Sequence, residues 1–443
     1  MKKILLCTTA LAGLVASSAS AGDLEVTFKG NAKFEAGTRQ YNKNNSAEYP
    51  LTANNNSSAF FSSSKASLGV TGKSDDLTYG ATIRLQVATN QANGTDRESR
   101  MDRSFIFLDS EFGSVQLGTN VAASKLAQVT ASNVASATGG VDGDFRRYLS
   151  QSVTWDNPQP NKDNGVPTTF GLFNRDLMVL GVDTLSNRKD GVTESAEKIT
   201  YITPRVEGAQ FLVSYVPDMS NGGNSVGETD NYGLTGTNPY YLSSSNRLRI
   251  RNLWSFGLNY KNTFDEVNVE LAATGDMGRS RQVSDSGYAA DNQIAVRDLK
   301  TWNVGGLVEM RGFSAVLSYS RDGSSALPKT NTVTVPTSPP NTNGGATTTT
   351  VSVDGSNFKA SWWTTGVAYA NGPMSTSLTY LSGKKGFSDY SVSSRVASLG
   401  ADYEVAPGFK PFAEVTYAKY SPNNSNYDSV KATVLILGTR VKF

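Results

Sequence analysis

The sequence predicts an all-β fold, a transmembrane antiparallel β-barrel of sixteen strands with short turns on one side and long loops on the other. Three features of the chain indicate it. Apolar and polar residues alternate at period two in run after run, tight turns alternate with long polar connections, and no apolar run of helix-spanning length follows the first 21 residues. Such strands turn one face to lipid and the other to water.

The first residues form a targeting segment. Lys2 and Lys3 give it positive charge, Ile4 to Val15 are mostly apolar, and Ala19-Ser20-Ala21 has the pattern of a cleavage site. The apolar stretch is too short for a membrane-spanning helix. We therefore expect a cleaved signal peptide at 1–21 and a single barrel domain at 22–443.

Composition excludes several classes of function. The chain has no histidine, and Cys7 is its one cysteine, inside the targeting segment. This excludes disulfide frameworks, thiolate or histidine-based nucleophile systems and histidine-based zinc sites, so we expect no enzyme, no catalytic residue, no metal and no cofactor. Without Lys2 and Lys3 the basic and acidic residues balance at 39 each. No basic patch suggests a nucleic-acid partner.

The alternation starts with the first strand, Leu24 to Thr38. Val26, Phe28 and Phe34 share one face, whereas Lys33 and other polar residues share the opposite face. A run of about fifteen residues exceeds the five or six of most soluble strands. It is long enough to cross a bilayer at a tilt.

Alternation or flanking turns place the other strands in order. The expected ranges are 60–72, 77–87, 103–110, 113–118, 198–204, 208–218, 253–261, 266–274, 299–311, 313–320, 358–370, 374–382, 396–405, 409–420 and 430–443. Seven short turns, near residues 75, 111, 206, 264, 311, 372 and 407, alternate with eight longer connections. Residues 331–350 have low complexity, and we expect a mobile surface loop there.

The last strand, Val430 to Phe443, must still satisfy its backbone groups. Pairing it with the first strand closes the barrel and removes the free edge. Val441 and Phe443 are therefore expected to act as the barrel-closing C-terminal signal.

Several of these motifs together resemble the Gram-negative general porins. They are the strand–turn–strand segment SFIFLDSEFGSVQLG at 104–118, the pair KITYITP at 198–204 and GAQFLVSYVPD at 208–218, and the ending LGTRVKF at 437–443. The resemblance implies an outer-membrane, water-filled channel for passive diffusion of ions and small hydrophilic solutes. It also implies that the barrel lies in outer-membrane lipid and that three copies of the chain assemble into a homotrimer.

The connection at about 120–196 is far longer than a rim loop needs. In general porins the loop after the fifth strand folds into the barrel and narrows it, and the resemblance implies the same here. The candidates are Asp142 and Asp144 on the loop, with Arg146 and Arg147 nearby. The alternation nominates four basic residues for the opposing pore wall, so that they face the acidic loop across the pore, namely Lys33, Lys65, Arg84 and Arg103. If the two aspartates line the narrowest point, the field there favours cations.

Alternatives remain open at this point. Ser152 to Pro158 also resembles a porin strand, and residues 170–184 would then supply its partner, giving eighteen strands and a narrower channel selective for a sugar or an anion. The long loops at 39–59 and 321–356 would also suit an adhesin or receptor. Asp142 and Asp144, two residues apart, would also suit a calcium-binding turn.

Overall fold

The computed structural model describes residues 24–41, 58–88, 98–149, 153–154, 169–170, 196–218, 234–235, 246–284, 297–325, 330–336, 348–354, 359–386, 391–422 and 429–443. The expected signal peptide lies outside these residues. So does most of the second half of the connection at 120–196. Among the described residues, no helix is both long and apolar enough to span a membrane.

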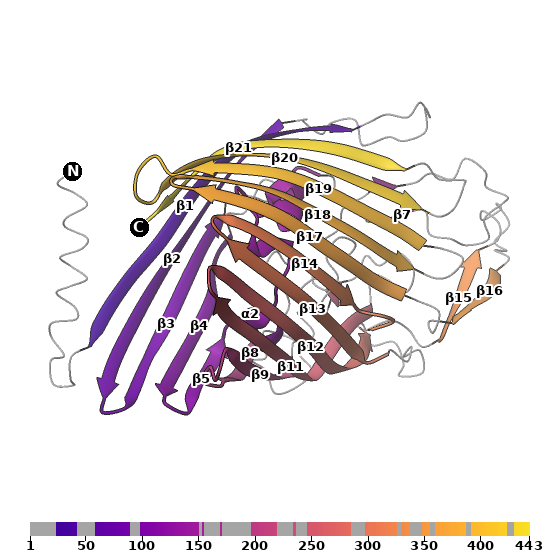
Figure 1. Ribbon diagram of the computed structural model, residues 1–443. Coiled ribbons are helices and arrows are strands. Elements are labelled where there is room, and N and C mark those ends of the chain that lie inside the picture. The colour runs from indigo at the N-terminus through magenta and orange to yellow at the C-terminus, as the bar shows by residue number, and fades with distance from the viewer. Residues whose placement is uncertain are drawn as a thin grey trace.

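Sixteen antiparallel strands form one closed barrel, as the sequence predicts (Figure 1). Each strand pairs with its neighbours along the chain, and the last pairs with the first. The strands are β1 (Glu25–Tyr41), β2 (Ser58–Ser74), β3 (Leu77–Ala88), β4 (Glu98–Ser110), β5 (Gly113–Thr119), β8 (Glu197–Ile202), β9 (Ala209–Asp218), β11 (Asn246–Phe264), β12 (Val267–Ser284), β13 (Leu299–Met310), β14 (Phe313–Arg321), β17 (Lys359–Asn371), β18 (Met374–Gly386), β19 (Ser391–Tyr403), β20 (Phe409–Pro422) and β21 (Val430–Lys442).

The eighteen-strand alternative is not what the barrel shows. Strands β6 (Val153–Thr154) and β7 (Thr169–Phe170) pair with each other in a separate two-stranded sheet and do not enter the barrel. The short β10 (Leu234–Thr235) pairs only with the start of β11. The sixteen remaining strands close the ring without them.

The ring closes between β1 and β21, where Val441 lies opposite Ala32. Beyond the last paired strand residue, Phe443 and Gly30 exchange two backbone hydrogen bonds of 2.7 and 3.0 Å. The ring of Phe443 lies 5.9 Å from that of Phe28. A Cβ at position 30 would lie 2.5 Å from the Phe443 ring, so the glycine leaves room for the ring in this position.

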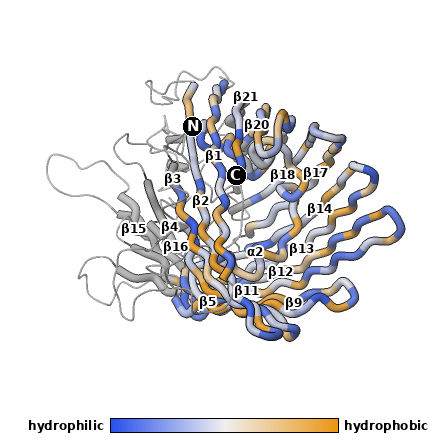
Figure 2. The backbone as a smooth tube through the Cα atoms, turned by 90° about the vertical axis from the view of Figure 1, so that its left-hand side faces the viewer, coloured by the Kyte–Doolittle hydropathy of each residue, from blue (hydrophilic) through white to orange (hydrophobic). Residues whose placement is uncertain are grey.

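The two faces of each strand differ as the alternation predicts. On β21, Leu435 and Leu437 are exposed on the outer face, whereas Val434 and Ile436, which alternate with them, are at most 1% exposed. Figure 2 shows the resulting alternation of hydrophobic and hydrophilic residues along the strands, with hydrophilic turns at their ends. An exposed apolar outer face of this kind suits a lipid environment.

The tight turns lie at one end of the barrel, and the strand ends that lead into the long connections lie at the other (Figure 1). The turn between β13 and β14 contains Arg311 and Gly312 with φ of 49° and 83°, as the common two-residue hairpin requires. Several strands run further towards the long-loop end than their apolar alternation predicts; β12, for example, continues to Ser284. The expected loop at 331–350 also contains parts of a hairpin, β15 (Thr330–Pro336) with β16 (Thr348–Asp354). Backbone pairing continues there because it does not depend on apolar side chains.

Candidate functional site

Residues 120–149 lie inside the barrel and follow its inner wall. The helix α2 (Ala123–Ala127) contacts β9, β11 and β12. Figure 1 shows it inside the barrel, next to these strands. Three short 3₁₀ helices then contact successive strands: η2 (Ala131–Asn133) touches β14, β17 and β18, η3 (Gly140–Asp142) touches β18 to β20, and η4 (Asp144–Arg147) touches β21. We call residues 120–149 the inner segment.

A buried lysine joins the two ends of the long connection. The ammonium of Lys198, a residue 4% exposed, donates to the carbonyl oxygens of Asn120 and Ala196. Next to it, the Thr119 hydroxyl donates to the Glu197 carboxylate over 2.8 Å. The two ends of the long connection therefore lie together at one point of the wall.

Side-chain oxygens on the inner wall accept hydrogen bonds from backbone amides of the inner segment. These amides have no strand partner, and burying them without acceptors would be unfavourable. The pairs of amide and hydroxyl, all between 2.7 and 3.1 Å, are Ala123 with Ser214, Ser124 with Ser255, Ala131 with Thr364, Ser136 with Ser377, and Val141 with Thr379.

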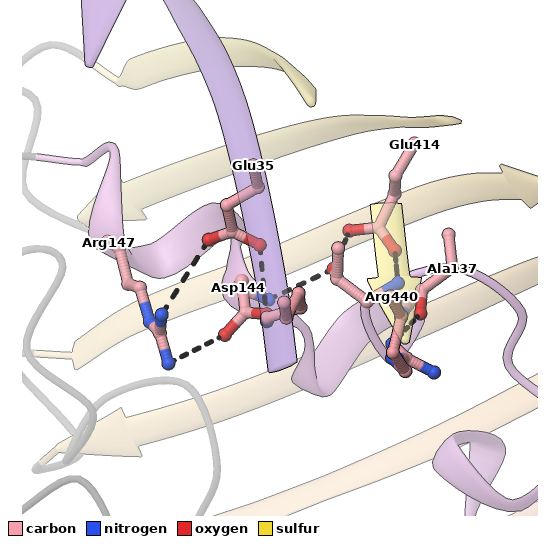
Figure 3. A network of polar contacts seen from close by, with 9 residues as sticks. Glu35, Ala137, Asp144, Arg147, Glu414 and Arg440 are labelled. Atoms are coloured by element: carbon pink, nitrogen blue, oxygen red, sulfur yellow. Dashed lines mark hydrogen bonds and ion pairs between the residues drawn. The ribbon is translucent and has the colours of Figure 1, made fainter. Parts of the chain in front are cut away.

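One carboxylate serves several of these amides at once. Glu414 on β20 is 1% exposed and accepts hydrogen bonds from the Thr138 hydroxyl at 2.6 Å, the Thr138 amide at 3.1 Å and the Gly140 amide at 3.3 Å (Figure 3). Nearby, Arg440 on β21 donates to the carbonyl oxygen of Ala137 over 2.7 Å. These contacts fix the middle of the inner segment on both its amide and carbonyl sides.

Glycines in the middle of wall strands make room for the inner segment. A Cβ at Gly305 on β13 would lie 2.1 Å from the carbonyl oxygen of Val129. A Cβ at Gly257 on β11 would lie 2.5 Å from the Cβ of Ala127 and 2.8 Å from the carbonyl oxygen of Ala123. Gly37, Gly366 and Gly400 face the inner segment in the same way, so we call these five residues the glycine seats. A glycine inside a strand often marks such a close approach of backbone.

Apolar side chains of the inner segment are buried against the wall. Val129 and Phe145 are fully buried, and the Tyr148 ring packs edge-on against Phe61 of β2 with 4.8 Å between centroids. They belong to one hydrophobic cluster that also contains wall residues such as Phe412. Burial of this kind favours the seated position of the segment over one in water.

A four-residue ion cluster fixes the far end of the inner segment to β1 (Figure 3). The carboxylate of Asp144 contacts the ammonium of Lys33, and it also lies 3.1 Å from the guanidinium of Arg147. Glu35, fully buried on β1, lies 3.1 Å from Lys33 and 3.7 Å from Arg147. Burial opposes ionisation of Asp144, but Arg147 and Lys33 outweigh it and hold its pKa below the ordinary value.

Asp142 makes a separate, more exposed pair. Its carboxylate lies 2.5 Å from the guanidinium of Arg146, which also donates to the carbonyl oxygen of Val141 over 3.1 Å. Asp142 and Asp144 thus contact cations. Among the described residues no cluster of metal-ligating side chains occurs, so the calcium alternative finds no support.

The four predicted basic residues all lie on the lumen side of β1 to β4. Lys33 does not face Asp144 across open space but contacts it directly. Lys65, Arg84 and Arg103 lie together on the next three strands, with Arg84 directly opposite Arg103 and opposite Ser67, two residues from Lys65. We call these three residues the basic wall.

Three further charged residues of the site, Glu35, Glu414 and Lys198, were not predicted from the sequence. Each has the lumen-facing position of its strand, and a charged residue at a position covered by other protein is expected to have partners. The alternation of the strands therefore indicates that these residues face the lumen, but it does not indicate which residues they contact.

A closed barrel of sixteen strands with a segment seated along its inner wall defines a class of protein, the outer-membrane channels. The profile of the Gram-negative porin family matches residues 8–423. The chain belongs to this family and is an outer-membrane porin, a water-filled channel for passive diffusion of ions and small hydrophilic solutes.

Its relatives include uncharacterized Rickettsia proteins. One from Rickettsia bellii is 25% identical over 484 aligned residues and covers both chains completely; one from Rickettsia prowazekii is 26% identical and covers 96% of this chain and 94% of its own. Among solved structures, the anion-selective porin from Comamonas acidovorans has a TM-score of 0.52, and a variant of the Rhodobacter blastica porin has 0.48. Both are 13% identical and cover 95% of this chain and 100% of their own.

Proposed function

We propose that the inner segment and the basic wall flank the narrowest point of the pore. The observation that carries this proposal is the continuous seat of residues 120–149 on the inner wall, which ends in the ion cluster beside β1. A segment held in this way narrows the lumen permanently. The channel then sorts solutes by size first and by the charge at the narrow point second.

We further propose a weak preference for anions. The expectation of a cation preference depended on Asp142 and Asp144, and both are now paired with cations. In the ion cluster, the Asp142–Arg146 pair and the basic wall taken together, the cations outnumber the carboxylates. The cations are Lys33, Lys65, Arg84, Arg103, Arg146 and Arg147, and the carboxylates are Glu35, Asp142 and Asp144. A summed positive charge in a narrow passage raises the local concentration of anions.

The porin family also supports a homotrimer. The described outward-facing residues of β1 to β5 include no lysine or arginine, and several are exposed and apolar, among them Phe28, Phe34, Ile83 and Ile106. We place the contacts between subunits on this uncharged wall. We propose no catalytic role for the chain, because the sequence has no histidine and one cysteine, in the expected signal peptide.

Single-channel recording in planar bilayers tests these statements together. We expect large, ohmic conductance steps that arrive in threes, and a reversal potential in a salt gradient with the sign of anion preference. Arg84→Gln with Arg103→Gln should move the reversal potential towards cations. Asp142→Asn with Asp144→Asn should move it further towards anions.

Lys73→Gln is the matched control, because Lys73 is an exposed residue on the same strand as Lys65, next to the tight turn of β2 and β3. It should leave the reversal potential unchanged. If the wall variant behaves like this control, the basic wall does not line the narrow point. A folded barrel that conducts no current would contradict the diffusion channel itself.

A further inference from the structure

Two phenylalanine rings stand on the lumen side of β4, next to the basic wall. Phe105 and Phe107 alternate with Ile106 and Leu108, which are 51% and 41% exposed on the outer face. Both rings are on the same face of the strand as Arg103, which precedes Phe105 by two residues. We call Phe105 and Phe107 the phenylalanine pair; their ring centroids lie 6.5 Å apart.

The phenylalanine pair stays accessible from the pore, unlike three other aromatic side chains of the inner wall. Phe61, Trp362 and Phe412 also lie on the lumen side, but they are at most 9% exposed. Phe105 and Phe107 are only half-buried. The helices of the inner segment contact strands from β9 to β21, so they pack against other strands than β4. The pair therefore offers apolar ring surface to a solute that passes through the lumen.

Small residues on the neighbouring strands leave room beside the pair. Gly80 on β3 lies directly opposite Phe107, and Thr82 lies directly opposite Phe105. A Cβ at Gly80 would lie 2.6 Å from the Phe107 ring, so this ring leans over β3 and covers its backbone. One strand further, Gly69 lies opposite Thr82, and a Cβ there would have no neighbour closer than 3.9 Å. The free face of the Phe107 ring is therefore turned to the lumen.

Two arginines of the basic wall border the phenylalanine pair on the side of the long loops. Arg103 and Arg84 lie directly opposite each other, two residues before Phe105 and two residues after Thr82. Two residues along a strand are about 7 Å apart, so a solute ring over Phe105 can place an attached carboxylate near Arg103. The pairing of β3 with β4 skips one residue between Met101 and Arg103, which makes a β-bulge there. Bulges redirect nearby side chains and are frequent next to functional sites.

A carboxylate borders the pair on the side of the tight turns. Asp109 follows Phe107 by two residues on the same face of β4, just before the turn to β5. Its charge repels an acidic group at this end of the pair, whereas Arg103 and Arg84 attract one at the other end. An acidic solute is therefore held in one orientation, with its carboxylate towards the long loops and its apolar part towards the tight turns.

We infer that the phenylalanine pair and the two arginines beside it form a subsite for small aromatic carboxylates, solutes with one acidic group on an aromatic ring. This inference rests on the proposed function, since it needs the basic wall to line the passage. The solute ring packs on the pair in an offset or edge-on arrangement, and its carboxylate accepts hydrogen bonds from Arg103 or Arg84. An aliphatic carboxylate of the same size meets the same charges but lacks the aromatic contact. The channel therefore distinguishes anions of equal charge by the presence of an aromatic ring.

Block of the ion current by added solutes tests this inference on the folded full-length barrel in planar bilayers. Benzoate, cyclohexanecarboxylate and benzamide are added in turn at constant salt, and the half-blocking concentration is measured for each solute. A well-placed pair of aromatic rings contributes roughly two- to tenfold in affinity beyond the apolar area that it buries. Benzoate should therefore block at a roughly two- to tenfold lower concentration than cyclohexanecarboxylate. Benzamide has the ring but no charge and should block much more weakly than benzoate.

Substitution of the pair separates the contribution of the rings from that of the charge. F105L with F107L removes both rings but keeps apolar side chains, so benzoate should lose its advantage over cyclohexanecarboxylate. The matched control, F211L with F264L, makes the same change at two exposed residues of the outer face and should keep the wild-type ratio between the two solutes. R103Q should weaken block by benzoate and by cyclohexanecarboxylate by the same factor, because both solutes use their carboxylate there.

The slower gel migration of a folded barrel before heating shows that each variant folds, and block is measured relative to the conductance of each variant. The inference is overturned if benzoate and cyclohexanecarboxylate block the wild-type channel at the same concentration, a comparison that needs no variant. It is overturned as well if F105L with F107L keeps the wild-type ratio, or if benzamide blocks as strongly as benzoate. A failure of the proposed function is seen separately, as a reversal potential that Arg84→Gln with Arg103→Gln leaves unchanged.

Discussion

Replacing Gly305 by alanine tests whether the glycine seats hold the inner segment. The new Cβ would lie 2.1 Å from the carbonyl oxygen of Val129, more than 1 Å closer than the 3.4 Å at which ordinary contact begins. Backbone cannot rotate away as a flexible side chain can, so the segment itself must move. The hydrogen bond from the Ala131 amide to Thr364, 3.0 Å long and two residues further on, would be strained by this movement.

The expected effect follows from the energetics of overpacking. One extra methyl group in a tightly packed site costs about 1–3 kcal/mol. Because a tenfold change in an equilibrium corresponds to about 1.4 kcal/mol, the population of barrels with a displaced segment should rise by roughly 5- to 150-fold. The barrel strands themselves should stay paired, since the clash involves the inner segment and not a neighbouring strand.

Thiol labelling measures this population directly. A chain expressed from Gly22 has no cysteine, so Val129→Cys introduces a single reporter at a fully buried position. A water-soluble thiol reagent should label it slowly in the otherwise native barrel. In the Gly305→Ala background, the labelling rate should rise by the same factor as the population of barrels with a displaced segment. The single-channel current should also become noisier.

Gly69→Ala provides the control. Gly69 also faces the lumen, on β2, but a Cβ there would have its nearest neighbour at 3.9 Å, an ordinary contact. This variant should label at the native rate. If Gly305→Ala labels no faster than Gly69→Ala, the glycine seats do not position the inner segment, and the reasoning from close approach is wrong.

Two further predictions concern the carboxylates around the inner segment. Glu414→Ala leaves two amides and one hydroxyl of the segment without their acceptor, at about 1–3 kcal/mol for each buried donor, whereas Glu414→Gln keeps one acceptor oxygen. Labelling of Val129→Cys should therefore be fast with alanine and intermediate with glutamine, and equal rates would contradict the assignment. Asp144 has a pKa below its ordinary 3.8, so its pairing with Arg147 and Lys33 stabilises the seated segment at neutral pH and is lost only as pH falls through that lower value. Current noise should rise in strong acid in the native channel but should show no such acid step in Asp144→Asn, whose noise is raised at every pH.

The barrel strands could be predicted from the sequence because each strand carries its own signal. An outer face towards lipid needs apolar residues and an inner face tolerates polar ones, so the alternation is written within a dozen consecutive residues. The tight turns between strands add Gly, Asp and Asn at short intervals. The ends of the strands were less predictable, since β12 and its neighbours continue as paired backbone after the apolar alternation stops.

The seat of the inner segment could not be predicted in the same way. Glu414 lies 276 residues from Thr138, and nothing near either residue indicates the other. Lys33 and Asp144 were expected to face each other from opposite sides because each was placed by its own neighbourhood alone. The curvature of the whole barrel determines which strand contacts each part of the inner segment. Local sequence patterns do not contain that information.

The junction of β1 with β21 has a consequence for how the chain folds. Ala32 and Val441, opposite each other at this junction, are more than 400 residues apart, so this pairing is the most distant contact between strands and the last available to a chain made from its N-terminus. Hairpins can form earlier, but the amides and carbonyls of β1 have no partner on one side until the final strand arrives. A chain without β21 would leave the edges of β1 and β20 unpaired. Unpaired strand edges pair readily with other molecules. Truncation of the chain by about a dozen residues at its C-terminus should therefore convert a soluble folding intermediate into an aggregating one.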